Sequence, residues 1–241
     1  MLAKLKIDCK QLYYRGALPS VALRVKASGL TYLSYDKLLS LSRLIRRLKA
    51  ARISGDFVEF GIALGGSAIF LASELDEGRA FYGYDVFEMI PPPAEMDDAK
   101  SRERYRVISS GNAVGIGGRQ YYGYIDNLLD VVRDNFTKFG MTVDGNKIVL
   151  RKGLFERTLP LDAERKIAFA HLDCDWYEPV WHCLVEASKR LSAGGLIVLD
   201  DYNDYGGCRK AVDRFVSENP EFHILYVRPH AVIRKSCSGS F

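Results

Sequence analysis

Apolar residues recur along the chain with two different periods, and each period predicts a different kind of element. Residues 34–50 carry an apolar set in which spacings of three and four recur, which is the pattern of an amphipathic helix: Leu38, Leu41, Leu44, Ile45 and Leu48. Ser34 stands at the position of an N-cap. Residues 1–30 mix short apolar groups with glycine and proline. We therefore expect a helical N-terminal arm or cap over residues 1–50 and one larger domain over residues 51–241.

After residue 50 the pattern changes to short apolar runs separated by helical segments. Strands are predicted at 56–61, 80–87, 147–153, 166–175, 194–202, 222–228 and 230–235, and helices at 68–75, 125–140, 179–192 and 208–220. Strands that alternate with helices predict a parallel sheet with helices on both faces. The expected fold class is α/β, with a seven-stranded, mostly parallel sheet whose last two strands form a hairpin.

The segment 88–124 fits neither period. It starts with the prolines at 91–93, continues through charged residues and ends in glycine and tyrosine. A connection of this length is long for a plain loop, and such segments are often functional. We expect an insertion that covers the substrate, in which Tyr121, Tyr122 and Tyr124 either contact the substrate or pack within the lid.

Composition excludes several classes of protein. The 241 residues are 48% hydrophobic and 27% charged, which is typical of a globular chain, and the net charge of +4 is too small to predict a nucleic-acid surface. No apolar run reaches the ~18–20 residues that span a bilayer, so no membrane partner is expected. The five cysteines contain no C-x-x-C pair, which argues against a disulfide framework or a zinc site and favours the cytoplasm.

Chemistry is expected at one rim of the sheet, because ligands of open α/β sheets bind beyond the carboxyl ends of the strands. Carboxylates recur at those ends, where they are solvated or bound to a ligand rather than part of the core. The residues at the five ends are Glu59 and Gly61, Asp85, Gly153 and Phe155, Asp173 and Asp175, and Asp200 and Asp201.

The loop after the first strand reads E-x-G-x-x-x-G-G-S, from Glu59 to Ser67. This spacing fits neither the dinucleotide fingerprint nor a P-loop, so a nicotinamide-dependent dehydrogenase is the least favoured enzyme. Glu59 suits an ammonium group, amides near Gly66 and Ser67 suit a carboxylate, and Asp85 is placed to bind ribose hydroxyls. An amino acid joined to a nucleoside describes S-adenosylmethionine, and a purely structural glycine-rich turn is the alternative.

The acidic residues after the fourth and fifth strands suggest a metal site. Asp173 and Asp175 are two apart, and alternate residues of a strand face the same side. With Asp200 and Asp201 they form a set of carboxylates without a histidine or cysteine pair, which suits a hard cation such as Mg²⁺. Helix caps or solvated turn acids are the alternative. His171 faces the same side deeper in the strand, where a core histidine is favoured over a catalytic one.

These motifs resemble those of the macrocin O-methyltransferase family (TylF-like), whose members methylate sugar hydroxyls in natural products with S-adenosylmethionine and Mg²⁺. The resemblance runs from about residue 54 to residue 216 and includes segments 55–67, 84–88, 132–136, 152–160, 173–178 and 195–215. The chain departs from the family pattern at Met89, Leu154 and Cys174, which stand where the family has glycine, tryptophan and glycine.

The resemblance implies a Rossmann-like class I methyltransferase fold and assigns Asp173, Asp200 and Asp201 as metal ligands and Asp175 as the general base. If Asp175 is not the base, His171 is the next candidate. The expected acceptor is a small-molecule glycoside, as in antibiotic biosynthesis, and the expected assembly is a homo-oligomer. The residues expected to bind the donor are Glu59, Gly61, Gly65, Gly66, Ser67, Asp85, Gly153, Phe155 and Asp173.

Two other functions remain open on the sequence. A methyltransferase for catechol-like phenols could use the same carboxylates, with Trp176, Tyr177 and Trp181 holding a flat ring. A protein that binds S-adenosylmethionine without catalysis is less favoured, because a sensor has no use for a metal beside the sulfonium.

Overall fold

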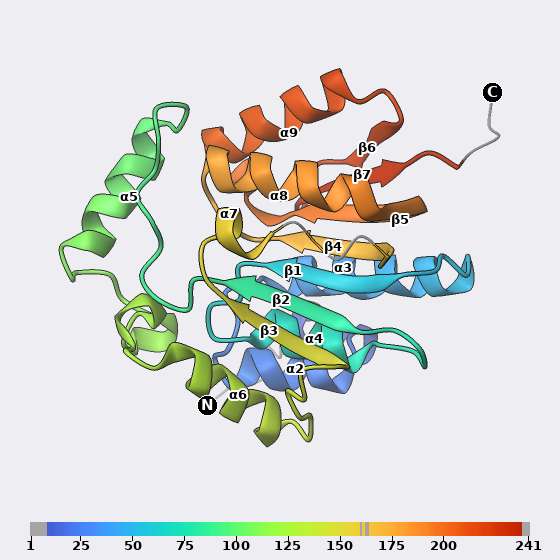
Figure 1. The fold of residues 1–241 in the computed structure, drawn as a ribbon. Coiled ribbons are helices and arrows are strands. Elements are labelled where there is room, and N and C mark those ends of the chain that lie inside the picture. The colour runs from blue at the N-terminus through green and yellow to red at the C-terminus, as the bar shows by residue number, and fades with distance from the viewer. Residues whose placement is uncertain (1–8, 160, 162–163, 238–241) are drawn as a thin grey trace.

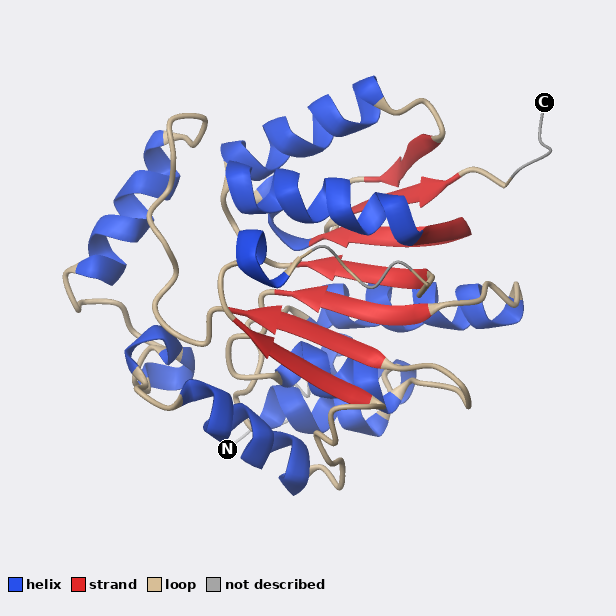
Figure 2. Cartoon of the chain, viewed as in Figure 1, coloured by secondary structure: helices blue, strands red, loops and turns tan. Residues whose placement is uncertain are grey.

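A twisted sheet runs through the middle of the molecule, and helices cover both of its faces (Figure 1; Figure 2). The computed structural model describes residues 9–159, 161 and 164–237. The strand order is β3-β2-β1-β4-β5-β7-β6, with β1 to β5 parallel and β7 antiparallel to both neighbours. The strands are β1 (Asp56–Phe60), β2 (Phe81–Asp85), β3 (Ile148–Lys152), β4 (Ile167–Leu172), β5 (Leu191–Leu199), β6 (Phe222–Tyr226) and β7 (Ala231–Lys235). This confirms the predicted seven-stranded α/β sheet and its terminal hairpin.

The two faces of the sheet bury separate hydrophobic cores. Phe57 and Phe169 point to one core and Val58 and Ala170 to the other, as the alternation of side chains along a strand requires. The first core lies under α1 (Cys9–Ala17), α2 (Ser20–Ala27), α3 (Tyr35–Ala50), α4 (Gly66–Ser73) and α6 (Leu128–Lys138). The second lies under α8 (Tyr177–Arg190) and α9 (Gly206–Glu218), beside the single turn α7 (Phe155–Thr158).

The N-terminal arm is part of the first core. The helix predicted at 34–50 is α3, and the Ser34 hydroxyl caps it by accepting a hydrogen bond from the amide of Lys37 at 3.2 Å. Its leucine stripe faces the sheet, and the side chains of Leu38, Leu41 and Ile45 are fully buried. The first eight residues of the predicted arm lie outside the described residues.

The predicted cover crosses the carboxyl ends of the strands. The arrowheads of β1 to β5 point to the side on which α5 (Ala99–Ser109) lies (Figure 1). The cover also contains the short turns η1 (Ile116–Gly118) and η2 (Tyr122–Tyr124). The sequence pattern did not predict α5, because only Ser101 and Ile108 of this helix are buried and no apolar stripe marks it.

The boundaries of β4 and β5 differ from the prediction in a way that matters for the site. β4 ends at Leu172, so Asp173 and Asp175 lie in the loop after it, and the expectation that they share one side of a strand is wrong. Asp175 has a φ of +58°, which a strand cannot contain. β5 ends at Leu199, and Asp200 and Asp201 begin the short turn η3 (Asp200–Asn203).

One glycine explains how closely β1 and β4 end together. Gly61 follows β1 with a φ of +91°, and a Cβ atom there would lie 1.9 Å from the carbonyl oxygen of Asp173. Only glycine fits this position, because any side chain would push the two strand ends apart. The glycine of the first motif therefore serves to bring Asp173 next to the first loop.

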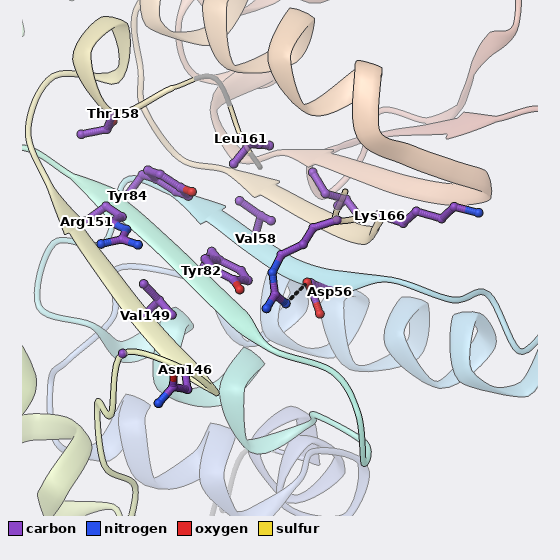
Figure 3. A pocket seen from close by; sticks show the side chains of 13 residues that line it. Asp56, Val58, Tyr82, Tyr84, Asn146, Val149, Arg151, Thr158, Leu161 and Lys166 are labelled. Atoms are coloured by element: carbon purple, nitrogen blue, oxygen red, sulfur yellow. Dashed lines mark hydrogen bonds and ion pairs between the residues drawn. The ribbon is translucent and has the colours of Figure 1, made fainter. Parts of the chain in front are cut away.

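A hollow of about 410 Å³ lies on the part of the sheet that α7 leaves uncovered (Figure 3). Val58, Tyr82 and Val149 form its floor, and Arg165 pairs with Asp56 at 2.9 Å on one side. It contains none of the carboxylates at the carboxyl ends of the strands, and we assign it no ligand. Among the described residues, no helix is long and apolar enough to cross a membrane.

Candidate active site

Two adjoining hollows lie at the carboxyl ends of the strands, beneath the cover. The first, which we name the acidic hollow, has a volume of about 330 Å³ and is lined by five aspartates from the loops after β4 and β5 and by the side chain of Asp85. The second, the apolar hollow, has about 420 Å³ and is lined by residues such as Ile90, Phe155 and Trp176. The residues that line both hollows are Gly61, Asp85, Tyr122, Asp173 and Asp175. The arrangement suits two ligands that meet at a shared wall.

Three carboxylates meet in the acidic hollow. Asp173, Asp200 and Asp201 each offer an oxygen atom, and these atoms lie within 4.8 Å of one another. They converge because β4 and β5 are parallel neighbours, whose carboxyl ends fall at the same edge. The structure therefore brings together the residues that the family resemblance assigns as metal ligands.

The charges of this cluster are not balanced by its own residues. Burial and the neighbouring Asp200 raise the pKa of Asp173 well above its usual range, and burial together with Asp175 and Asp173 does the same for Asp201. The Oδ1 atom of Asp200 is buried and has no hydrogen-bond partner among the described residues. Buried, mutually repelling carboxylate oxygens are the donor set that a hard divalent cation stabilises, so these residues fit Mg²⁺.

Asp200 is held differently from its neighbours, because the ammonium of Lys37 and the imidazoles of His171 and His230 surround it. Burial opposes its ionisation, but the imidazoles of His171 and His230 and the ammonium of Lys37 outweigh burial and hold the pKa of Asp200 below its usual range. Its Oδ1 lies 3.9 Å from His171 Nε2 and 3.7 Å from His230 Nδ1. Asp200 is therefore the member of the cluster whose ionised form the surrounding side chains stabilise most.

Lys37 is a site residue that the sequence analysis missed. It lies on α3 of the N-terminal arm, and its Nζ atom donates to Asp200 Oδ2 at 2.7 Å, to the Asp200 carbonyl at 3.1 Å and to Asp204 Oδ2 at 3.3 Å. These carboxylates raise the pKa of Lys37 above its usual value even though burial opposes this. Lys37 is 163 residues from Asp200 along the chain, so no local motif indicated the contact.

Asp175, the predicted general base, lines both hollows. Its backbone amide donates to Asp201 Oδ2 at 3.2 Å, which fixes the loop in its left-handed conformation. Burial raises the pKa of Asp175 to about 7, although the nearby Arg104 opposes the shift. A carboxylate with this pKa accepts a proton more readily than an ordinary aspartate does.

His171, the second candidate base, is fully buried and lines neither hollow. Its Nδ1 atom lies 2.7 Å from Oε1 of Glu59 on the neighbouring strand. Despite burial, Asp200 and Glu59 raise the pKa of His171 to about 10. The geometry supports the core-histidine interpretation, with the ring between Glu59 and Asp200.

The residues expected to bind the donor are only partly exposed to the hollows. Gly61, Asp85, Phe155 and Asp173 line at least one of them, whereas Glu59, Gly65, Gly66, Ser67 and Gly153 line neither. The side chain of Glu59 is fully buried against His171, so its contact with a ligand ammonium stays a prediction. The amide of Gly66 already donates to the carbonyl of Leu30 in the arm at 3.0 Å.

Asp85 organises the first loop as well as facing the hollows. Its Oδ2 accepts hydrogen bonds from the amides of Ile62 at 2.6 Å and Ala63 at 3.1 Å, and its Oδ1 accepts one from Phe87 at 2.6 Å. Burial raises the pKa of Asp85 above its usual value, and the three hydrogen bonds offset only part of this rise. The carboxylate therefore holds the loop after β1 against the end of β2.

The cover contributes aromatic and basic side chains. Tyr121 and Tyr122 line the acidic hollow, as do Lys100 and Arg104 of α5. Tyr124 instead packs within the cover, where its hydroxyl donates to the carbonyl of Ile108. Tyr121 and Tyr122 are thus placed to contact a substrate, whereas Tyr124 packs within the lid.

The aromatic group after β4 has a mainly structural role. Trp176 lines the apolar hollow and donates from Nε1 to the carbonyl of Pro91 at 3.0 Å, which ties the cover to α8. Tyr177 and Trp181 pack in the core between α8 and α9 and line neither hollow. This group does not form a platform for a flat ring in the acidic hollow.

Comparison with known proteins gives a family match and several relatives. Residues 22–220 match the family model for macrocin-O-methyltransferase (TylF). The 8-demethyl-8-(2,3-dimethoxy-alpha-L-rhamnosyl)-tetracenomycin-C 4'-O-methyltransferase of Streptomyces olivaceus is 31% identical over 186 residues, which cover 76% of this chain and 66% of that protein. The mycinamicin III 3''-O-methyltransferase of Micromonospora griseorubida is 26% identical over 191 residues, covering 77% and 69%. The chain thus spans about two thirds of the length of these relatives.

Solved structures share the fold. The O-methyltransferase NovP matches with a TM-score of 0.68 at 20% identity and covers 94% of this chain and 99% of that chain. The calicheamicin methyltransferase CalS11 matches with a TM-score of 0.58 at 17% identity and covers 91% and 92%. This likeness confirms the predicted class I methyltransferase fold.

We predict that Lys37→Met lowers the free energy of unfolding by roughly 2–3 kcal/mol in EDTA at pH 7, because it leaves the buried carboxylate of Asp200 without its ammonium partner. Urea denaturation measures the change. Lys49→Met is the matched control, since Lys49 pairs with Glu74 and Asp76 at a more exposed site of the same helix and its loss costs about 1 kcal/mol or less. Equal losses for the two variants, or no smaller loss in an Asp200→Asn background, would contradict the assignment.

Proposed function

The chain belongs to the macrocin O-methyltransferase (TylF) family, and from that premise we propose that it transfers a methyl group from S-adenosylmethionine to a sugar hydroxyl of a small-molecule glycoside, assisted by Mg²⁺. The match bears out the family that the sequence motifs resembled and the predicted enzyme class, an O-methyltransferase. The sugar acceptor is proposed because the names of the relatives describe O-methylation of the rhamnosyl group of tetracenomycin and the 3'' position of mycinamicin III.

One observation carries the proposal: one member of the carboxylate cluster, Asp173, lies with the proposed base Asp175 at the wall that the two hollows share. Asp173 and Asp175 line both the apolar and the acidic hollow. We assign the donor nucleoside to the apolar hollow, where Phe155 can contact the base and Asp85 the ribose. The acceptor then occupies the acidic hollow, and the two reacting atoms meet beside Asp175.

When bound, S-adenosylmethionine supplies a methyl group activated by its sulfonium, and the cation lowers the pKa of the acceptor hydroxyl. Asp173, Asp200 and Asp201 would hold the cation. Lys37 and His171 keep Asp200 in place from two sides, at 2.7 Å and 3.9 Å. Tyr121 and Tyr122 close the hollow and exclude water, and positioning of the two substrates supplies much of the rate.

Asp175 is the residue proposed to accept the proton of the hydroxyl. It lines both hollows, whereas His171 lines neither. The catechol alternative loses two of the three rings expected to hold the phenol, because Tyr177 and Trp181 pack between α8 and α9. Donor binding without catalysis is disfavoured by the cluster, which costs stability and is unnecessary for binding a nucleoside.

The proposal is tested by incubating the protein with labelled S-adenosylmethionine and a panel of rhamnosides, other glycosides and catechols. We expect label on a glycoside hydroxyl, and we expect EDTA to remove it and Mg²⁺ to restore it. Transfer to catechols alone would contradict the acceptor class, and undiminished transfer in EDTA would contradict the metal.

Two variants separate the role of the cluster from that of the base. Asp201→Ala should weaken Mn²⁺ binding by at least ~10-fold and leave the affinity for S-adenosylhomocysteine within about threefold, as calorimetry measures. Asp175→Asn should retain Mn²⁺ binding but lose ~10²–10⁴-fold in kcat on the acceptor found in the panel. Asp134→Ala is the control for both, because Asp134 is exposed on α6 and lines neither hollow. Full activity of Asp175→Asn would place the base elsewhere.

A further inference from the structure

The cover places two basic side chains opposite the carboxylate cluster. Lys100 and Arg104 lie four residues apart on α5, so they share one face of the helix, and both line the acidic hollow. Neither charge is explained by the proposed transfer of a methyl group to a neutral sugar.

Arg104 differs from the other arginines of α5 because it lacks a polar partner. Among the residues that the structure describes, its guanidinium makes no hydrogen bond or ion pair, and its contact is with the ring of Tyr121, whose centroid lies 5.4 Å from Cζ. By contrast, Arg102 donates to the carbonyls of Ala94, Glu95 and Asp97, and Arg106 pairs with Glu103.

A partly buried guanidinium has specific chemical needs. It carries five N–H donors in one plane, and its fork matches the two oxygens of a carboxylate or a phosphate. The π electrons of the Tyr121 ring attract the positive charge, but the ring cannot accept the in-plane hydrogen bonds of the guanidinium. The donors of Arg104 are therefore unsatisfied by the protein while the side chain lines a hollow.

Arg104 is not the counter-ion that holds the cluster. No carboxylate of the described residues lies within ion-pair distance of it, whereas Lys37 contacts Asp200 at 2.7 Å. Lys100 is also engaged, because its Nζ atom donates to the carbonyl of Asp204 at 2.6 Å. Among the described residues that line the acidic hollow, Arg104 is thus the cation that is available to a ligand.

We propose that Arg104 binds an anionic group of the acceptor, a phosphate ester or a carboxylate, and so selects acidic glycosides over neutral ones. The inference rests on the proposed function in one respect, which is that the acidic hollow takes the acceptor. The anionic group would lie on the side of the cover, and the reacting hydroxyl on the side of the cluster.

The test follows the side-chain Nε–Hε resonance of Arg104 in protein saturated with S-adenosylhomocysteine and Mg²⁺. The resonance is identified by its absence from Arg104→Lys, and inorganic phosphate and acetate are the two probes. We expect a saturable shift with at least one probe, phosphate if the group is an ester and acetate if it is a carboxylate. The Nε–Hε resonance of Arg106, identified by its absence from Arg106→Lys, should show no saturable shift with either probe.

A second experiment uses the variant Arg104→Gln. Its affinity for S-adenosylhomocysteine should stay within about twofold of the wild type, whereas the bound probe should be lost. No saturable shift of Arg104 with either probe overturns the inference. A tenfold or greater loss of S-adenosylhomocysteine affinity also overturns it, because Arg104 would then bind the donor carboxylate. Metal-dependent methylation of neutral glycosides by the same protein would leave the proposed function intact.

Discussion

The accumulation of negative charge at the ends of β4 and β5 is the constraint around which the rest of the site is built. Three carboxylates with oxygen atoms within 4.8 Å of one another repel, and the burial of Asp200 and Asp201 adds to the free-energy cost of ionisation. The chain lowers this cost with groups from other elements. Lys37 neutralises Asp200 from the arm, and His171 and His230 face its other oxygen. The remaining excess of negative charge is what makes the cluster suitable for a divalent cation.

This repulsion explains why the N-terminal arm and the cover, which are far apart in the sequence, both contact the carboxyl ends of the strands. The same helix α3 carries Lys37 and Ser40, and the hydroxyl of Ser40 lies 2.9 Å from Nε2 of His230. The arm thus supports Asp200 both directly and through the imidazole. The cover adds Arg104 above the same aspartates without pairing with them. The loops after β4 and β5 supply the acids, the helices α3 and α5 supply the cations, and the cover supplies Tyr121 and Tyr122.

The central strands were predictable because burial on both faces produces short apolar runs, as at β1 and β2. The carboxylate of Asp85 at the end of β2 then marked the rim where a ligand binds. The helix α5 was not, because its single buried apolar residue, Ile108, leaves no periodic stripe. Asp175 was placed in the site for the wrong reason, since a loop with a φ of +58° rather than a strand turns it inward. Lys37 could not be found, because a lysine on the polar side of an amphipathic helix looks like any solvated residue until the helix is docked.

The most direct measurement of the central claim is a crystal structure of the protein with S-adenosylhomocysteine and Mn²⁺, recorded at a wavelength where manganese scatters anomalously. We expect one strong anomalous peak, from a manganese ion bound by oxygens of Asp173, Asp200 and Asp201. The nucleoside should lie beside Phe155, with its sulfur directed toward Asp175. A peak elsewhere, or a saturated crystal in which those carboxylates bind no metal, would contradict it.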